Sequence, residues 1–561
     1  MKISKHTMSL NVVDKVGDVK IYGEGLLGGK GEGLVKINEC KIPQAHKLRT
    51  RILTTNFYDR FLEQGRTFGD EEQNTFAQIL ERLGKIPISV RSSATNEACI
   101  SAGGRDTVHA GENTSFMLPN NHPQFSVRFN QFLKAVYYIY NDFINNQPSD
   151  SQEKMAIVIN PIPGVFEDTR AGPVYYPLVS GVANSFFPYA LKNQNPEEGF
   201  ARVAFGHGYA TVLDDFPVVS MATVKNPIPV HLLGKGQRFF YSLDMSRNQD
   251  LQGYELETMK KLNVNFAHSP TKQKMGERKG YVTFKNLVHD DLYGFRSGLR
   301  EIMEVISSQI SSHFLIEFVF NLHREGEKEE KGTFHVVQLT ELPERKFEPI
   351  VIPKDWKEEY LSIRSLQGHG VKRGIKYALV VSPFVYTKDQ HDKVRRQIAE
   401  SNRQMKAEDD NFILIVPGRL GTKNRDWGIQ ADYRDVDRAS AIFEYGVDIA
   451  GRADPVPEKD VSEGGGIYGS HFLYMIQGGE DEKEKRLKTR IYGTQGTHFF
   501  TNLMSHNVIY GYIDPIRDKI DPWFFKTMDK NEAVGVLEFP QPVSVYADSL
   551  NQTCTVGKEK G

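Results

Sequence analysis

Three short blocks of the chain combine residue types that bind phosphate. The first is the glycine-rich block Gly28–Gly33 (GGKGEG), which precedes the apolar, helix-like run Leu34–Ile37. Glycines let backbone N–H groups approach an anion, and a helix N-terminus favours negative charge. Lys30 could then place its ammonium on a phosphate. The spacing fits neither the Walker A pattern nor the dinucleotide fingerprint, so a turn without a ligand is the alternative.

The second block, Ile86–Thr95 (IPISVRSSAT), is an apolar, strand-like run that ends in an arginine and a hydroxyl-rich segment. The guanidinium of Arg91 can clamp a phosphate with two parallel hydrogen bonds, and serine hydroxyls add neutral donors. The alternative is a surface arginine followed by the N-cap of a helix.

The third block places Glu317 within the apolar run Phe314–Phe320, and Phe334–Gln338 follows it. A carboxylate on such a strand costs free energy unless it is paired or bound to a metal. Because Mg²⁺ favours a few carboxylates together with phosphate oxygens, Glu317 is a candidate metal ligand. The alternative is an outward-facing side chain, since alternate strand positions are exposed.

Two further features are candidates for chemistry. His498 lies in the block Gly493–Leu503 (GTQGTHFFTNL), where an accessible imidazole could accept a phosphoryl group; a structural histidine beside a sheet edge is the alternative. His471 is a weaker version of the same idea. The segment Pro417–Thr422 could form an anion-binding nest with Arg419, or it could simply be a turn that ends a strand.

The elements that must position these residues follow from hydrophobic spacing. A polar stretch at 324–332 is expected to be a hairpin tip between two strands, and 342–354 to be a linker. After the linker, a strand, a helix and a strand predict a βαβ unit with parallel pairing. The expected strands are Ile86–Val90, Met155–Ile159, Phe314–Asn321, Thr333–Leu339, Tyr377–Ser382 and Phe412–Val416, and the expected helices cover 129–145, 291–313 and 387–407.

The bulk composition predicts a soluble globular protein, and the cysteine usage predicts a cytoplasmic one. The 561 residues include 70 Lys+Arg and 71 Asp+Glu, so no net charge favours nucleic acid or an anionic membrane as a partner. The chain has no apolar run near 18 residues and no secretory signal at its start. Three scattered cysteines, Cys40, Cys99 and Cys554, are expected to be reduced thiols.

Taken in order, the three blocks resemble the nucleotide-binding region of phosphoenolpyruvate synthase and pyruvate phosphate dikinase. The resemblance covers about residues 20–345 and implies an ATP-grasp-type fold that binds ATP. Intermediate segments are similar as well, including the strand that precedes the family's adenine-binding hinge. The matching segments are Gly28–Gly31, Arg91–Ala94, Met155–Ile159, Gly181–Ser185, Phe205–Tyr209, Ile316–Phe318 and Gln338.

A closer resemblance, to bacterial phosphoenolpyruvate synthase-like proteins, spans nearly the whole chain. These proteins have a second domain with a Pro-Gly-Arg-x-Gly turn and a Gly-Thr-His-Phe-Phe block, which correspond here to Pro417–Gly421 and Gly496–Phe500.

The resemblance implies specific roles. Lys30 contacts ATP phosphates, Arg91 the terminal phosphates, and Glu317 and Gln338 bind Mg²⁺ or phosphate. A further hydroxyl contact follows an Ala-Gly pair in the family, for which Thr107 after Ala102-Gly103 and Ser115 after Ala110-Gly111 compete. Ser115 is favoured, because the Phe-Met-Leu-Pro-Asn that follows it matches the closer relatives.

The chain departs from the family pattern at positions that would contact the metal and the terminal phosphate. The resemblance therefore implies nucleotide binding but leaves catalytic turnover open. Leu315 stands where the family has an aspartate, and Thr340-Glu341 where it has Arg-Pro. Each lost charged contact is worth about 1.5–3 kcal/mol. The family's phosphohistidine block is missing, and the roughly 215 residues after 345 are too few for the family's TIM barrel, which needs about 250.

The sequence therefore predicts an α/β and α+β multidomain protein, with an ATP-grasp-type region followed by a smaller α/β domain. The expected boundaries are 1–120, 121–345, 355–535 and a tail at 536–561. The expected function is phosphoryl transfer from ATP, with Mg²⁺, to a histidine on the chain itself (His498) or on a phosphate-accepting protein or small molecule. A non-catalytic nucleotide-binding or scaffold protein and an ATP-grasp ligase are the alternatives, and oligomerisation is left open.

Overall fold

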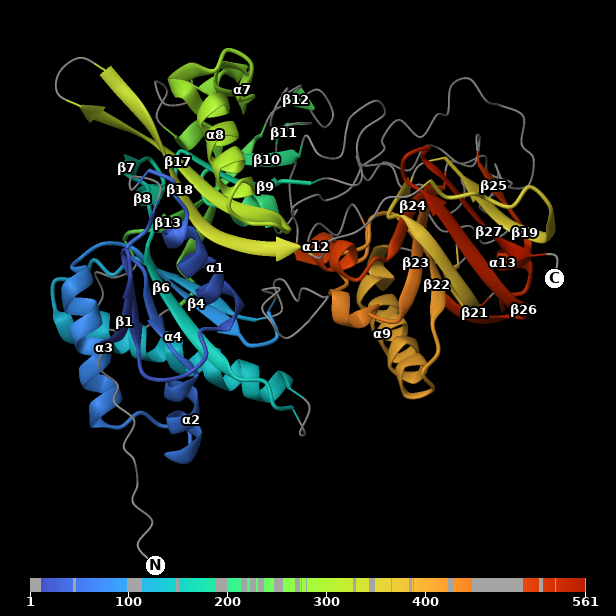
Figure 1. The fold of residues 1–561 in the computed structure, drawn as a ribbon, viewed down its shortest axis with the longest axis horizontal. Coiled ribbons are helices and arrows are strands. Elements are labelled where there is room, and N and C mark those ends of the chain that lie inside the picture. The colour runs from blue at the N-terminus through green and yellow to red at the C-terminus, as the bar shows by residue number, and fades with distance from the viewer. Residues whose placement is uncertain are drawn as a thin grey trace, which may run out of the picture. The chain divides into compact units, whose positions relative to one another are not determined.

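The computed structural model divides the chain into two compact units (Figure 1), which are described separately below. Described residues up to Leu342 form the first unit, and those from Pro349 onward form the second. The structure describes residues 12–559, apart from a few single positions and fifteen longer segments. These segments are 44–46, 98–112, 148–150, 187–198, 213–218, 222–228, 231–236, 247–255, 268–272, 326–328, 343–348, 383–385, 422–427, 446–497 and 514–517.

The first sheet of the first unit is built around the strand β6 (Met155–Pro161), which is buried on both faces. Ile157 and Ile159 pack with helices α2, α3 and α4, whereas Val158 packs beneath α1. This alternation follows from the two-residue period of a strand. The strand order is β1 (Val12–Val16), β2 (Val19–Tyr22), β3 (Arg51–Leu53), β6, β4 (Ile88–Ala94), β5 (Ser115–Leu118), and the helices are α1 (Gly28–Glu39), α2 (Thr55–Glu63), α3 (Asp70–Leu83) and α4 (Phe125–Asn146).

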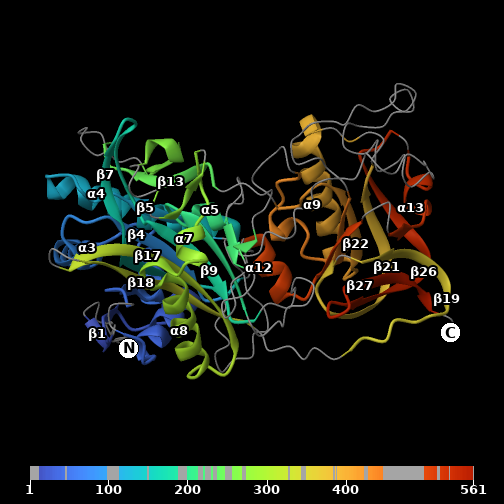
Figure 2. The same cartoon turned by 90° about the horizontal axis from the view of Figure 1, so that it is seen from above.

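A second, antiparallel sheet of the first unit carries the long hairpin of β17 (His313–Glu325) and β18 (Glu329–Leu342). Helix α8 (Phe295–Ser307) lies beside this hairpin in both views (Figures 1 and 2). Phe314, Ile316, Phe318 and Phe320 face the core on which α8 packs. The sheet order is β12 (Pro229–Val230), β11 (Val219–Met221), β10 (Phe200–Phe205), β9 (Val179–Asn184), β17, β18.

A smaller sheet covers the same core from the other side, because Val174, Tyr176 and Phe240 belong to one apolar cluster with the hairpin phenylalanines. Its order is β14 (Met259–Asn263), β13 (Phe239–Asp244), β8 (Gly172–Tyr176), β7 (Val165–Thr169). The remaining short elements are α5 (Tyr209–Val212), η4 (Val264–Phe266), β15 (Glu277–Arg278), β16 (Tyr281–Val282), α7 (Lys285–Val288) and η5 (Leu292–Gly294).

The second unit is built on one mixed sheet in which β21, β22, β23 and β24 pair in parallel. Helix α9 connects β21 to β22, as the βαβ pattern of the sequence predicts. The sheet order is β20 (Leu366–Gln367), β24 (Ile509–Ile513), β23 (Ala439–Tyr445), β22 (Phe412–Pro417), β21 (Gly370–Val381), β26 (Val534–Asp548), β27 (Thr553–Glu559), β19 (Trp356–Ile363), β25 (Lys519–Ile520), with η6 (Lys388–Gln390), α9 (His391–Ala407), η7 (Tyr433–Asp435), α12 (His498–Ser505) and α13 (Trp523–Lys526).

The sequence predicted a tail at 536–561, but the described residues 536–559 do not form one. They contribute most of β26 and all of β27, which pair with β21 and β19 inside this sheet. Val543, Val545 and Ala547 of β26 lie in the apolar core of this sheet, and every residue from Val543 to Asp548 is buried. Burial of this segment, together with its pairing to β21 and β27, holds it in the sheet.

The expected secondary structure is otherwise confirmed where it is described. The helix expected at 129–145 is α4, and the hairpin expected around 324–332 is formed by β17 and β18, which pair as far as Glu325 and Glu329. The helix expected at 291–313 is shorter than predicted. It is α8, preceded by η5, and it ends at Ser307 before β17 begins. A mixed α and β multidomain architecture is therefore correct.

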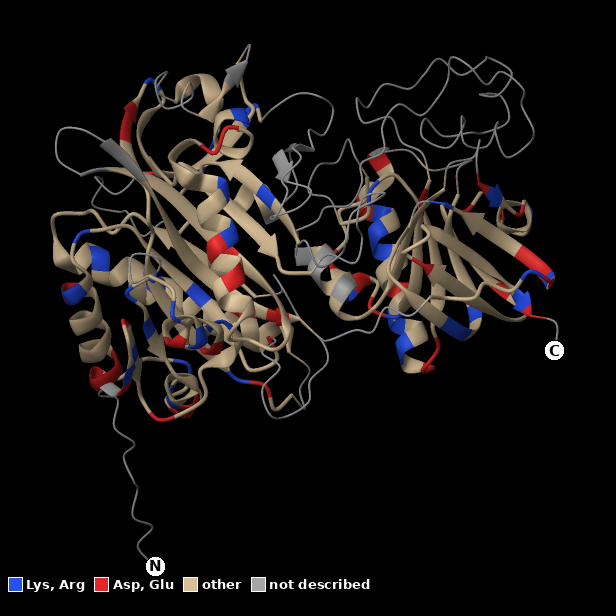
Figure 3. Ribbon diagram, turned by 45° about the horizontal axis from the view of Figure 1, so that its top comes forward, with Lys and Arg blue, Asp and Glu red and all other residues tan. Residues whose placement is uncertain are grey.

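The distribution of charged residues along the chain also agrees with the composition. Lys and Arg residues are interspersed with Asp and Glu along the elements of both units (Figure 3). Cys40 and Cys554 are buried free thiols, and Cys99 is outside the described residues. Among the helices that the model describes, none is long and apolar enough to cross a membrane.

Candidate functional site

The glycine block is not a turn before a helix but the first turns of helix α1, which begins at Gly28. Glycine is unfavourable inside a helix, so close packing must explain the block. A Cβ atom at Gly28 would lie 2.0 Å from the carbonyl oxygen of Ser93, and one at Gly33 would lie 2.1 Å from that of Leu339. The glycines therefore bring α1 against the ends of β4 and β18.

This packing places Lys30 beside the carboxyl end of β4. The side-chain oxygen of Ser93 accepts a hydrogen bond from the backbone N–H of Gly31 at 3.0 Å, which holds the first turn of the helix. Lys30 Nζ forms an ion pair with Glu97 Oε1 at 2.6 Å. Burial lowers the pKa of Lys30, and the adjacent carboxylate of Glu97 opposes that change.

Glu97 is itself fixed by two further donors. The backbone N–H of Ala94 donates to Oε2 at 3.3 Å, and the amide of Asn113 donates to Oε1 at 3.2 Å. The backbone of Glu97 also packs on Gly29, where a Cβ atom would lie 2.3 Å from its carbonyl oxygen. Sequence reasoning missed Glu97, although it lies only six residues after Arg91.

Arg91 lies in the middle of β4 and reaches the β17–β18 hairpin. Its guanidinium donates to Glu317 Oε2 at 2.9 Å, to the carbonyl oxygen of Val337 at 3.0 Å and to the amide oxygen of Gln338. The ladder register shifts between Glu317 and Phe318, which leaves Val337 as an extra residue in β18. Such a bulge redirects backbone groups, and here it accompanies the contact between the Val337 carbonyl and Arg91.

Ser115 lies directly across the ladder from Arg91, at the start of β5. Its hydroxyl accepts a hydrogen bond from the backbone N–H of Ser92 at 3.3 Å and lies 3.3 Å from the Ser92 hydroxyl. The structure therefore brings together Lys30, Arg91, Ser115, Glu317 and Gln338. These five residues and Glu97 are called the Arg91 cluster below. The competing Thr107 register falls outside the described residues.

His207 lies close enough to this cluster to interact with the charges of Arg91 and Glu317. The sequence alone did not establish this proximity. Burial and the positive charge of Arg91 lower the pKa of His207 to about 4, against an opposing effect of Glu317. His207 Nδ1 accepts from the backbone N–H of Tyr209 at 3.4 Å, which leaves the proton of the neutral ring on Nε2. His207 is thus a neutral hydrogen-bond donor at physiological pH.

Two of the three positions that depart from the pattern of the resembled family, Leu315 and Thr340, are uncharged, and the third is Glu341. Leu315 is buried in a small cluster with Val182 and Leu342, and Thr340 accepts a hydrogen bond from the Gln338 amide at 3.1 Å. Glu341 forms an ion pair with Lys36 of α1. The hairpin therefore offers the Arg91 cluster one carboxylate, Glu317, and no second cation from β18 at position 340.

A metal site made by protein alone does not fit this arrangement. Over the described part of the chain, no three His, Cys, Asp or Glu side chains gather in a way that could hold a metal ion. Glu317 and Gln338 offer one carboxylate and one amide oxygen, both bonded to Arg91. They fit Mg²⁺ only as a partial set that phosphate oxygens would complete.

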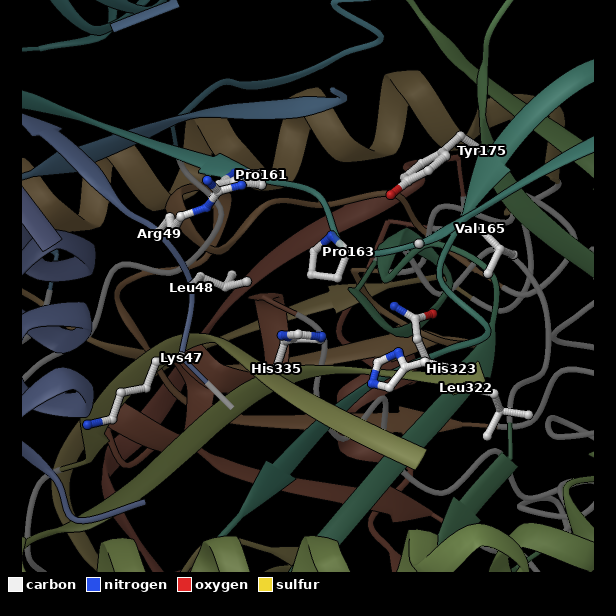
Figure 4. A pocket seen from close by; sticks show the side chains of 12 residues that line it. Lys47, Leu48, Arg49, Pro161, Pro163, Val165, Tyr175, Leu322, His323 and His335 are labelled. Carbon is white, nitrogen blue, oxygen red and sulfur yellow. The ribbon is translucent and has the colours of Figure 1, made fainter. Parts of the chain in front are cut away.

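A pocket of about 340 Å³ lies along the same hairpin (Figure 4). Residues two apart on a strand share a face, so Asn321 and His323, which line it, share the face of Glu317. His335 lines it from β18, Pro161 lines it from the end of β6, and Pro163 and Gly164 line it just after that strand. The pocket therefore adjoins the end of β6.

The remaining candidates lie in the second unit. His498 is the first residue of α12, but its side chain is outside the described part, as is His471. Arg419 follows β22 in a turn where Gly418 and Gly421 have positive φ angles of 66° and 76°. Arg419 is buried, and the adjacent backbone N–H of Leu420 donates to Glu444 at 2.6 Å. Thr422, the last residue of the expected nest, is not among the described residues.

Comparison with models of known protein families gave no match for this chain, and a search of curated proteins likewise found no relative.

Proposed function

We propose that the first unit binds ATP and that the chain is an ATP-dependent phosphotransferase of the dikinase type, which passes a phosphoryl group to a histidine. The observation that supports this most strongly is the convergence of Lys30, Arg91, Glu317 and Gln338. These side chains come from three elements that are far apart in sequence, α1, β4 and the β17–β18 hairpin. Two cations beside uncharged donors are the groups that stabilise charge during phosphoryl transfer.

The roles follow from the chemistry of each side chain. Arg91 binds the terminal phosphate through its planar fork, and Lys30 adds a point charge from the start of α1. Ser115 and the Nε2–H of His207 serve as neutral donors. Glu317 and Gln338 would hold Mg²⁺ together with phosphate oxygens, and the ion would neutralise part of the polyphosphate charge.

We further propose that the adenine base of ATP lies in the pocket beside β6, the strand that resembles the one before the family's adenine-binding hinge. Its lining combines the apolar side chains of Pro163, Val165 and Leu322 with the planar rings of His323 and His335 (Figure 4). Apolar walls with a few polar groups are typical of small-molecule sites. Replacing His323 with tryptophan would fill this space and should weaken ATP binding without changing the affinity for inorganic tripolyphosphate.

The acceptor is proposed to be His498 or a histidine on a partner. A neutral imidazole nitrogen forms a P–N bond as the P–O bond to the leaving nucleotide breaks, and the ring proton passes to solvent. A non-catalytic nucleotide-binding protein is the second candidate, and it is favoured by Leu315 and Thr340, which supply no charge where the family has it.

The deciding experiment incubates the full chain with Mg²⁺ and ATP labelled separately at the β and γ positions. Acid-labile label on the protein that is lost in Lys30→Ala and Arg91→Ala would support the transferase. Its loss in His498→Ala would identify the acceptor, and the nucleotide product would show which bond breaks. Bound ATP with no transferred label and no AMP or ADP would rule out an autonomous transferase.

Matched controls change the same residue types at exposed sites. Lys41→Ala, Arg170→Ala and His289→Ala remove exposed cationic or imidazole groups of the first unit. All three variants should retain the wild-type label, since none of these side chains belongs to the Arg91 cluster.

A further inference from the structure

The ion pair between Lys30 and Glu97 is held in one place. The exposed fractions of the two side chains are only 13% and 8%, and the Nζ–Oε1 distance is 2.6 Å. Ala94 and Asn113 each donate to the Glu97 carboxylate, and Gly29 packs against its backbone. The carboxylate therefore cannot move away from Lys30 without breaking other contacts.

The charges of the Arg91 cluster cancel. Lys30 and Arg91 are balanced by Glu97 and Glu317, and His207 is neutral because its pKa lies near 4. A free polyphosphate approaching Lys30 would therefore meet a fixed carboxylate next to the cation. Placing like charges side by side costs several kcal/mol at a desolvated contact.

The two carboxylates differ in how they oppose a phosphate. Arg91 has five N–H donors and already shares them among three acceptors, so a phosphate can join Glu317 on the same guanidinium. Lys30 is a point charge with its nearest carboxylate at 2.6 Å. Glu97 is thus the group whose charge a ligand at Lys30 must overcome.

Resting on the proposed function, we propose that Glu97 determines the ionic form of the substrate. Its carboxylate disfavours metal-free polyphosphate and makes binding depend on a divalent cation that arrives with the phosphates. Without the carboxylate of Glu97, Lys30 would bind polyphosphate with or without a divalent cation. Glu97 is a specificity-determining residue in this scheme and touches no reacting atom.

The test measures the affinities of ATP and inorganic tripolyphosphate by calorimetry, with Mg²⁺ and with a chelator, at pH 7. Wild-type protein should bind both ligands at least about tenfold more tightly with Mg²⁺. Glu97→Gln keeps the shape and the one oxygen that accepts from Lys30 and Asn113 while removing the charge, so it should bind the metal-free ligands more tightly and lose most of this Mg²⁺ dependence. Glu24→Gln, which removes an exposed carboxylate near the start of α1, should behave as wild type.

A second variant tests the opposite direction. Asn113→Asp places another carboxylate beside Glu97 and should weaken metal-free binding further, so its Mg²⁺ dependence should exceed that of wild type. Thermal unfolding without ligand verifies that each variant is folded. If Glu97→Gln is unfolded, an unchanged Mg²⁺ dependence in Asn113→Asp would overturn the proposal.

The other outcomes are also decisive. Equal Mg²⁺ dependence in wild type and a folded Glu97→Gln would overturn this inference and leave the proposed function intact. Weaker binding of both ligand forms by Glu97→Gln would show that Glu97 only positions Lys30. If wild-type protein binds neither ligand in either condition, the proposed function itself fails, and the inference fails with it.

Discussion

Arg91 and Glu317 are 226 residues apart in sequence and join two parts of the first unit. The guanidinium Nη2 of Arg91 donates a hydrogen bond to Glu317 Oε2 at 2.9 Å. Both side chains are mostly buried, with exposed fractions of 13% and 19%. Glu317→Ala should lower the free energy of unfolding by about 1.5–3 kcal/mol, because it removes a charged hydrogen bond from a partly desolvated arginine. Urea unfolding measures this, and a double-mutant cycle with Arg91→Ala isolates the pair.

An exposed pair in the same unit serves as the control. Arg300 and Glu304 lie one helical turn apart at 3.9 Å, and about half of each side chain is exposed. Their coupling energy should stay below about 0.5 kcal/mol. Equal coupling in the two pairs would show that the link from Arg91 to the hairpin does not stabilise the unit.

His207 should make the first unit sensitive to acid. Its pKa of about 4 in the folded state lies below the ordinary value of 6.5, so the unfolded state binds more protons between these two pH values. The stabilisation is complete above pH 6.5 and decreases as the pH falls toward 4, by on the order of 2 kcal/mol for this partly buried ring. His207→Asn should lack this component in urea unfolding at pH 6.5, 5.5 and 4.5. Parallel pH profiles for the two proteins would refute the assignment.

The sequence predicted the elements and most of the Arg91 cluster, because both depend on local pattern or on recognisable blocks. Apolar, strand-like runs located β6 and the β17–β18 hairpin, and the resemblance grouped Lys30, Arg91 and Gln338. Glu97 was missed, and His207 was noted only as part of a glycine-rich loop near the nucleotide and was not selected, because the importance of both comes from what approaches them in space. A glutamate after a hydroxyl-rich segment and a histidine between glycines have no distinctive local pattern.

The glycine block is a second case in which local sequence pattern does not reveal long-range packing. Local propensity favours a turn for Gly28–Gly33, since glycine destabilises a helix by roughly 0.5–1 kcal/mol relative to alanine. The helix forms nevertheless, because only glycine fits against Ser93 and Leu339. Packing partners 65 and 306 residues away decided the structure, and they cannot be identified from the block itself.

The Gly33→Ala substitution distinguishes helix propensity from close packing, because the two effects change the free energy of unfolding in opposite directions. Helix propensity alone predicts a stabilised protein, whereas a Cβ atom 2.1 Å from the Leu339 carbonyl oxygen predicts a loss of more than about 2 kcal/mol. Urea unfolding measures the difference. Gly65→Ala is the control, because it adds a Cβ in open space at a φ of +70° and should cost only about 1–2 kcal/mol of backbone strain. A stabilised Gly33→Ala protein would contradict the packing explanation for α1.

Glu444 should hold the turn that follows β22 in the second unit. This carboxylate is only 4% exposed and accepts hydrogen bonds from the backbone N–H of Leu420, at 2.6 Å, and from the hydroxyl of Tyr510. Glu444→Ala removes the acceptor of two buried donors and should destabilise the unit by about 3 kcal/mol, whereas Tyr510→Phe removes one donor and should cost about 1 kcal/mol. Hydrogen exchange at the Leu420 amide separates the variants, because only Glu444→Ala should accelerate it strongly. Similar exchange in both would mean that Glu444 does not hold this turn, and that Arg419 is positioned by other contacts.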